Sequence, residues 1–230
     1  MCGVCYTGFQ NSSHFHNTSN RRSLLLLVFG GALLLRLLLA YTTHGFSNDI
    51  ACFAAWADRI FTLGPGQFYS AEMFTDYPPG FMYVLYLIGA LRSLLQIPYY
   101  SDLHILLLKL PAILCDIACG FLLYREAVKR LHFSDLQGIF AASAYLFQPA
   151  VILNSSCWGQ VDSVYTLMII LMCLFLMKGN LLPAYAVYGL GVLLKPQMLI
   201  FTPVLLAGIW DHVFLSLIHI SEPTRRTPIS

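Results

Sequence analysis

Long apolar runs separated by short polar segments dominate this sequence. A helix that crosses a membrane needs about 20 mostly apolar residues, and its backbone polar groups must be satisfied within the protein. Seven runs approach the required length: 23–41, 79–95, 103–124, 136–153, 163–177, 181–194 and 197–210. We therefore predict an all-α fold, a polytopic transmembrane helical bundle of about six or seven membrane segments.

The composition agrees with a membrane protein and argues against some partners. Of the 230 residues, 58% are hydrophobic and 10% are charged, whereas soluble domains carry about 25% charged residues. The net charge is +2 and no run of basic residues occurs, so no nucleic-acid partner is expected. The motif Cys2-Gly3-Val4-Cys5 has no second pair of this spacing, so neither a metal site nor a cofactor is predicted.

Three segments organise the chain. Residues 1–22 are polar and end in Arg21-Arg22, and because basic residues favour the cytoplasm we expect a cytoplasmic tail. Residues 23–214 form the expected membrane module, in which 23–41 is an uncleaved signal anchor and 42–78 is an outer loop. Residues 215–230 resemble the in-frame translation of a sequencing adaptor, so we expect a non-native tail there.

The outer loop contains a predicted interfacial helix. Over 50–63, apolar side chains recur at helical spacing, at Phe53, Trp56, Ile60 and Leu63. This pattern is typical of an amphipathic helix that lies in the membrane surface. Such a helix would hold the loop against the bilayer.

The basic residues leave one conflict in the topology. The basic cluster within 125–130 should face the cytoplasm together with Arg21-Arg22. If both 79–95 and 103–124 crossed the membrane, that cluster would lie outside. We therefore predict that 79–95 does not cross fully, which is allowed where protein covers the segment. The polar blocks of the chain would then share the outer face.

Asp49 is the first candidate for chemistry. It begins the predicted interfacial helix, where free N–H groups and the helix dipole stabilise a carboxylate. The alternative is that Asp49, or Asn48 before it, serves only as a helix cap.

Two further carboxylates stand beside membrane segments. Asp76 precedes Tyr77 and a diproline that stiffens the entry to the next apolar run. Asp162 belongs to the segment Trp158-Gly159-Gln160-Val161-Asp162-Ser163, here called the Trp158 block, which follows another run. Its carboxylate and amide are costly at a helix end unless they face water or a ligand.

Two lysines are candidates for binding an anion. Lys109 lies within an apolar run, seven residues before Asp116 and so on the same helix face. Charges inside a membrane usually have a function and a partner. The alternatives for Lys109 are a structural pair with Asp116 or a side chain that extends to the interface. Lys195 precedes Pro196 and Gln197 at a span boundary, where interface anchoring is the alternative.

Carboxylates and lysines on one outer face suit transfer from a phosphate-activated donor. A cation would stabilise the phosphate leaving group, and a carboxylate would act as general base on an acceptor hydroxyl. A lipid-linked donor would explain a site at the membrane surface. The spacing alone does not exclude a transporter.

The order of these blocks resembles the GT-C superfamily of integral-membrane glycosyltransferases. The nearest likeness is to the prokaryotic branch similar to the GPI-anchor mannosyltransferases, and the dolichyl-phosphate-glucose-dependent glucosyltransferases look more distant. The resemblance covers 37–203 and rests on Asn48-Asp49 before Trp56, Asp76-Tyr77-Pro78-Pro79-Gly80, Lys109 before Asp116, Pro149 before the Trp158 block, and Lys195-Pro196-Gln197.

The resemblance implies a fold, a donor and roles for the site residues. The chain would be the N-terminal conserved module of a GT-C bundle, and the donor a polyprenyl-phosphate sugar, with mannose expected. Asp49 would be the catalytic base of an inverting transfer, without metal or cofactor. The implied substrate-binding residues are Asp76, Tyr77, Trp158, Gln160, Asp162, Lys109, Lys195 and Gln197, with the two lysines directed to the donor phosphate.

Members of this superfamily are longer and have a later outer loop that helps to bind the lipid donor, so the activity of this fragment is left open. The expected partners are the donor, an unidentified acceptor and membrane lipid, at the outer face of a bacterial cell membrane. One alternative is a transporter or lipid flippase, with Lys109 and Asp116 lining a path. Another is a non-catalytic membrane subunit, in which Asp49 and Asp162 would lie far apart.

Overall fold

The computed structural model describes residues 7–70, 74–208 and 210. The described residues are mostly helical and include no strand, which confirms the predicted all-α class. The chain folds into two compact units. Unit 1 comprises 1–73 and 82–167, and unit 2 comprises 74–81 and 168–230. The predicted non-native tail lies outside the described residues.

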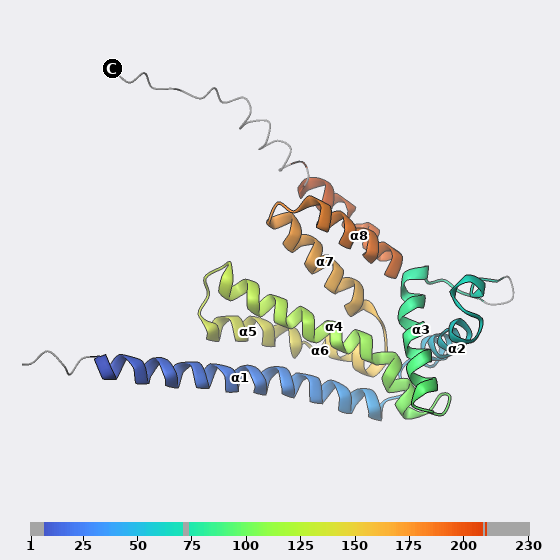
Figure 1. The fold of residues 1–230 in the computed structure, drawn as a ribbon, viewed down its shortest axis with the longest axis horizontal. Helices are drawn as coiled ribbons and strands as arrows, with labels where there is room; N and C mark the ends of the chain where they lie inside the picture. The colour runs from blue at the N-terminus through green and yellow to red at the C-terminus, as the bar shows by residue number, and fades with distance from the viewer. Residues whose placement is uncertain (1–6, 71–73, 209, 211–230) are drawn as a thin grey trace, which may run out of the picture. The chain divides into compact units, whose positions relative to one another are not determined.

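The helices follow one another in chain order (Figure 1). Two elements cross the unit boundary, since α3 begins in unit 2 and α7 begins in unit 1. The α-helices are α1 Thr7–Thr42, α2 Ser47–Leu63, α3 Pro79–Leu94, α4 Asp102–Lys129, α5 Asp135–Leu146, α6 Pro149–Ile152, α7 Asp162–Met177 and α8 Leu181–Leu194. Two short 3₁₀ helices, η1 Pro65–Gln67 and η3 Pro196–Phe201, and one π-helix, η2 Leu153–Trp158, complete the described elements.

Two of the described helices are long and apolar enough to cross a membrane, Arg21–Thr42 and Asp102–Lys129. A third span results if Asp135–Leu146 and Pro149–Trp158, which meet at a bend of 51°, count as one. The other apolar helices are shorter. The 16 residues of α3 and of α7 rise only about 24 Å, against a hydrocarbon core of about 30 Å. Two or three candidate spans are therefore observed, and the predicted six or seven are not confirmed.

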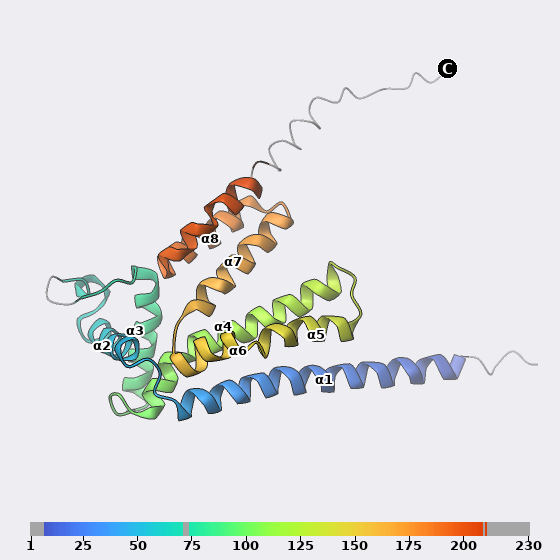
Figure 2. The same ribbon diagram turned by 180° about the vertical axis from the view of Figure 1, so that it is seen from behind.

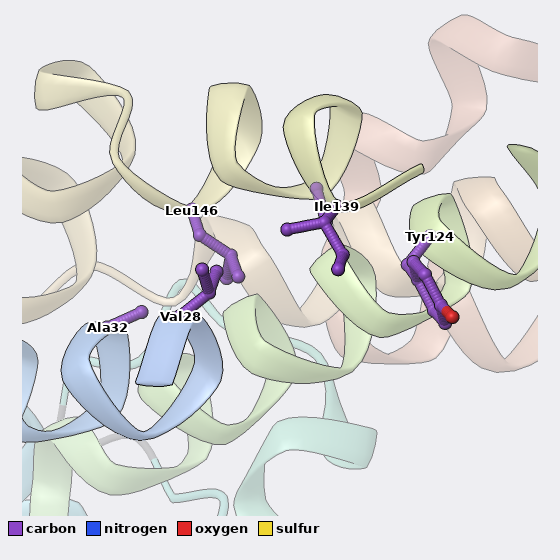
Figure 3. Close-up of a cluster of buried hydrophobic side chains, with 6 residues drawn as sticks. Val28, Ala32, Tyr124, Ile139 and Leu146 are labelled. Atoms are coloured by element: carbon purple, nitrogen blue, oxygen red, sulfur yellow. The ribbon is translucent and has the colours of Figure 1, made fainter. Parts of the chain in front are cut away.

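The core of unit 1 forms where α1, α4 and α5 pack together (Figure 3). Its buried side chains are Val28 and Ala32 of α1, Tyr124 of α4, and Ile139, Ala142 and Leu146 of α5. At Gly120 the two helices α4 and α5 approach so closely that an added Cβ would lie 2.7 Å from the Leu146 side chain. Such overlap is not tolerated in a filled interior, so glycine is needed there.

The bend between α5 and α6 coincides with Pro149. Proline has no N–H group and its ring clashes with the preceding helical turn, so α5 ends at Leu146 and a new helix starts at Pro149. That helix continues into η2, where the N–H groups of Gly159 and Gln160 both donate to the Asn154 carbonyl, at 3.1 and 3.0 Å. Single π-helical turns of this kind are frequent at functional sites.

Arg21 and the basic cluster within 125–130 belong to the same end of unit 1. At one end Arg21 forms an ion pair with Asp135 at 3.3 Å, and the Tyr124 hydroxyl donates to the same carboxylate at 2.9 Å. The basic cluster within 125–130 follows Tyr124 directly and so lies at this end. The C-terminal end of α1, the start of α4 and the Trp158 block lie at the other. Arg21 and the basic cluster within 125–130, which the sequence predicts on one side of the membrane, therefore lie at the same end of unit 1.

The helices α2 and α3 pack on each other at the end that carries the Trp158 block. An added Cβ on Gly89 of α3 would lie 2.5 Å from the Ala57 carbonyl oxygen of α2, and Asp58 of α2 pairs with Arg92 of α3. Residues 82–94 run across the direction of α1 and α4 rather than beside them (Figures 1 and 2). This arrangement agrees with a segment that does not cross fully.

Unit 2 has a core of its own, built from the later part of α7, from α8 and from the helical segment Pro196–Gly208. Its buried side chains are Met172, Leu176, Ala184, Met198 and Leu205. The diproline segment packs on α8, because an added Cβ on Gly80 would lie 2.5 Å from the Leu193 carbonyl oxygen.

Replacing Gly120 by alanine should lower the free energy of unfolding by about 1–3 kcal/mol, because the added methyl group overlaps Leu146 in a filled core. The matched control is Gly30→Ala in α1, where an added Cβ meets nothing within 4 Å and alanine favours the helix by roughly 0.5–1 kcal/mol. Thermal unfolding of the detergent-solubilised chain measures both. Equal melting temperatures for G120A and the wild type would contradict this packing.

Candidate functional site

The loop before α2 is hydrogen-bonded to the Trp158 block. The Phe46 N–H donates to the Trp158 carbonyl at 2.8 Å, and the two rings are 5.6 Å apart. Gly45 has a φ of +78°, and an added Cβ there would lie 2.7 Å from the same carbonyl oxygen. Gly159 has a φ of +87°, and a Cβ added to it would lie 2.6 Å from the Ile50 side chain of α2. Both positions favour glycine for the backbone conformation, and at Gly45 the Trp158 carbonyl also leaves no space for a side chain.

Asp49 lies in the first turn of α2, where its carboxylate accepts a hydrogen bond from Gln160 Nε2 of the Trp158 block. The residue that caps α2 is Phe46, and it makes no side-chain cap bond. The alternative in which Asp49 or Asn48 is the helix cap is therefore wrong, because the helix begins before both. The N-terminal end of the helix stabilises the Asp49 charge, and the side chain is partly buried.

Asp162 begins α7 and is held by Asn154 of η2. The Asn154 Nδ2 donates to Asp162 Oδ2 at 3.0 Å, and the Asn154 carbonyl accepts the backbone N–H of Gln160 at 3.0 Å. Asn154 therefore positions both the Asp162 carboxylate and the residue that binds Asp49. It was not among the predicted site residues, and the only signal for it was an amide within an apolar run close to the Trp158 block.

Lys109 is fully buried, and its ammonium group bonds to the ends of two other elements. It donates to the Ala40 carbonyl at 3.3 Å and to the Thr43 carbonyl and hydroxyl at 2.7 and 3.1 Å. It also donates to the Ser156 carbonyl of η2 at 2.9 Å. A cation suits the carbonyl end of a helix. The alternative of a pair with Asp116 is wrong, because the Lys109 ammonium group bonds to these carbonyls and Asp116 pairs with Arg36.

The partner of Asp116 is Arg36 of α1, at 3.2 Å, and both side chains are fully buried. Arg36 also donates to the Leu146 carbonyl at 2.7 Å. Asp116 in turn accepts from the Ser163 hydroxyl at 2.5 Å and from the Tyr145 hydroxyl at 3.2 Å. The negative charge of the buried Asp116 carboxylate is therefore compensated by the Arg36 guanidinium and by two hydroxyl donors. The sequence signal for Arg36 was a single arginine inside the first apolar run.

Two hollows flank η2. The first, here called the Trp158 hollow, has a volume of about 360 Å³ and a mostly apolar lining of Gly45, Phe46, Leu153, Cys157 and Trp158. The second, the Asn154 hollow, has a volume of about 250 Å³ and is lined by Tyr145, Ala150, Val151, Asn154, Asp162, Ser163 and Thr166. Trp158 is 52% exposed, so the first hollow is open at the surface.

The remaining predicted site residues lie in unit 2. Lys195 is buried, with its ammonium nitrogen 5.9 Å from the centre of the Tyr77 ring, a cation–π contact that joins two of the predicted blocks. Asp76 and Gln197 are exposed. Unit 1 thus brings together Asp49, Gln160, Trp158 and Asp162, and unit 2 brings together Tyr77 and Lys195.

The chemistry available in these groups is that of carboxylates, amides and hydroxyls. Among residues 7–70, 74–208 and 210, no group of three or more His, Cys, Asp or Glu side chains could hold a metal ion. The Cys2–Cys5 motif lies outside these residues.

Comparisons of the chain with protein-family models, with curated proteins and with solved structures find no match. The interpretation of the site therefore depends on its own geometry and on the order of the sequence blocks.

Replacing Arg36 by methionine should lower the free energy of unfolding by about 3–5 kcal/mol, because Asp116 is left buried and charged without its partner. The double variant R36M/D116L should regain part of this loss, since it removes both charges. Chemical unfolding in mixed detergent measures R36M, D116L and the double variant. Strictly additive losses in the two single variants would show that the pair does not interact.

Lys109→Met should also destabilise the chain, by about 1–3 kcal/mol or more, because the buried acceptors at the ends of α1 and η2 lose their donor. The matched control is Lys129→Met at the exposed end of α4, where a change within about 0.5 kcal/mol is expected. The same unfolding measurement applies. Equal effects of the two substitutions would mean that the buried ammonium does not hold these elements together.

Proposed function

We propose that this chain is the N-terminal module of an inverting glycosyltransferase that takes a sugar from a polyprenyl-phosphate carrier. The observation that carries the proposal is the Asp49 carboxylate, held by Gln160 in the first turn of a helix at one end of the candidate spans. Asp49 and Gln160 are 111 residues apart in the chain. They belong to two blocks that the GT-C resemblance expects to act together.

The proposed step is a single displacement at the anomeric carbon. Asp49 takes the proton of the acceptor hydroxyl, the acceptor oxygen bonds to the anomeric carbon, and the bond from that carbon to the phosphate oxygen breaks. Polyprenyl phosphate leaves with its electron pair. Attack opposite the leaving group inverts the configuration, so a β-linked mannosyl phosphate would give an α-mannoside. The Gln160 amide keeps the carboxylate in one orientation, which favours proton transfer.

The position of Asp49 at the end of the spans supports a lipid-linked donor. Arg21 and the basic cluster within 125–130 lie at the opposite end of unit 1, and such clusters favour the cytoplasm, so we place Asp49 on the extracytoplasmic side. The Trp158 hollow beside it offers an apolar surface for the carrier lipid. Mannose as the sugar and a bacterial membrane as the location follow from the resemblance alone.

The predicted substrate-binding roles of Asp76, Tyr77, Lys195 and Gln197 are part of the proposal. The role of Lys109 changes, because its ammonium group already bonds to carbonyls of the protein. We assign it to holding the site together rather than to the donor phosphate.

The two alternative functions receive less support. A transporter would use Lys109 and Asp116 along a path, whereas both are bonded within the protein. A non-catalytic subunit was expected to keep Asp49 far from Asp162. Here Asp49 contacts Gln160, two positions before Asp162 in the same block.

Asp49→Asn in the full-length enzyme should lower transfer by about 10²–10⁴-fold, the usual contribution of a general base. Transfer of radiolabelled sugar from polyprenyl-phosphate mannose, with the glucose and galactose donors in parallel, measures it. Asp102→Asn is the control, because Asp102 is an exposed carboxylate of the same end, in the first turn of α4.

Gln160→Leu should lower transfer less than D49N does, because it removes the group that orients the base but leaves the base. Near-normal transfer by D49N, with expression like that of the wild type, would overturn the assignment of Asp49. If D102N lost as much transfer activity as D49N, the negative charge at this end of the protein would be responsible, and not the Asp49 carboxylate in particular.

A further inference from the structure

The helix α3 carries an apolar face that the described part of the chain leaves largely uncovered. Tyr83, Leu87 and Leu94 of this face are 57%, 67% and 78% exposed, and Leu91 is also exposed. These four residues recur every three or four positions, so they lie along one side of the helix. A continuous exposed apolar face marks a surface that contacts another protein or a membrane.

The opposite side of α3 packs on α2. The rings of Tyr86 on α3 and Phe61 on α2 lie 6.0 Å apart. Arg92, the one charged residue in α3, pairs with Asp58 of α2, so its guanidinium group is directed toward α2. The exposed side of α3 is therefore both free of charge and turned away from α2.

The arrangement of unit 1 gives this exposed side a direction. In both views α2 lies beyond residues 82–94, on the side away from the bodies of α1 and α4 (Figures 1 and 2). Residues 82–94 run across α1 and α4, which contain the candidate spans, so this part of α3 lies along the membrane surface. Its exposed side, opposite α2, is then directed toward the bilayer.

The helix that the sequence predicts at the interface, α2, is less suited to contact lipid. Its apolar residues Phe53, Trp56 and Ile60 are 2%, 2% and 1% exposed, because they pack inside the protein. An interfacial helix needs its apolar face free to enter the bilayer. This condition is met by α3 and not by the buried face of α2.

The apolar face of α3 continues onto the start of α4. Tyr99 and Tyr100 of the connecting loop are exposed, and tyrosine is enriched where a protein meets the membrane–water interface. The loop is held in place by the Tyr100 N–H, which donates to His104 Nδ1 at 3.1 Å. Leu103 and Leu114 of α4 are exposed on the candidate span itself. Lipid that surrounds α4 can therefore reach α3 without a break.

We propose that the exposed face of α3 binds the acyl chains of the leaflet at the Asp49 end, so that α3 lies in the membrane plane as an anchor. A helix of this kind buries its apolar face roughly 5–10 Å into the boundary between headgroups and acyl chains. Because α2 packs on the other side of α3, the anchor also sets the height of α2 and Asp49 above the acyl chains. This contact does not require the proposed transfer activity.

The test measures the depth of single positions in the full chain, reconstituted in phosphatidylcholine vesicles. A genetically encoded fluorescent amino acid is placed at Tyr83 or at Leu94, and its quenching by phosphatidylcholines brominated at several depths gives its distance from the bilayer centre. Both positions should be quenched at the same shallow depth. The matched control pair is Leu103 and Leu114 of α4, which have the same separation in sequence and should differ in depth by about 16 Å if α4 crosses.

A depth difference between Tyr83 and Leu94 like that of the control pair would show that α3 crosses the membrane, and would overturn the proposal. Quenching of both positions by iodide in the buffer, without quenching by the brominated lipids, would show that the face meets water and would also overturn it. Protection from both quenchers would mean that a second copy or another protein covers the face, with the same consequence. If the probe at Tyr83 prevents folding, Leu87 and Leu94 provide the same comparison.

Discussion

The buried ammonium group of Lys109 is the interaction on which the arrangement of the Asp49 site depends. A charge inside a membrane-spanning helix is costly unless hydrogen-bond acceptors surround it, and here the carbonyls that end α1 and those of η2 supply them. The lysine therefore holds the loop before α2 and the Trp158 block next to each other. The Phe46–Trp158 backbone bond and the Asp49–Gln160 contact both require that proximity.

A second buried charge pair supports the site from deeper in unit 1. Arg36 and Asp116 join α1 to α4, and Asp116 also receives the hydroxyl hydrogens of Tyr145 and Ser163. The charges inside the helices thus have a supporting role in the fold of unit 1.

Much of the local structure followed from the sequence pattern. The apolar runs predicted helices, and the helix predicted over 50–63 is observed as α2, from Ser47 to Leu63. The clustering of Asp49 with the Trp158 block was also predicted, from the sign of the charges at the helix ends. The number of membrane spans was not predicted correctly. A run of apolar residues shows that a helix is buried or faces lipid, but it does not show whether the helix runs across the membrane. The contacts of Gly89 and Arg92 with α2 turn α3 across its neighbours.

The sequence by itself determined the all-α class, the helices apolar enough to span a membrane, the helix over 50–63 and the residue types of the polar blocks, since these depend on composition and on periodicity along the chain. Tertiary structure alone decided which charges pair. Asp116 bonds to Arg36, 80 residues away, rather than to Lys109 on its own helix face. Tertiary structure also decided that Asn154 fixes Asp162 and leaves an oxygen without a partner. The reason is physical: a polar group inside a packed bundle bonds to whichever carbonyl or carboxylate the neighbouring helices bring within about 3 Å, and helix packing sets that choice.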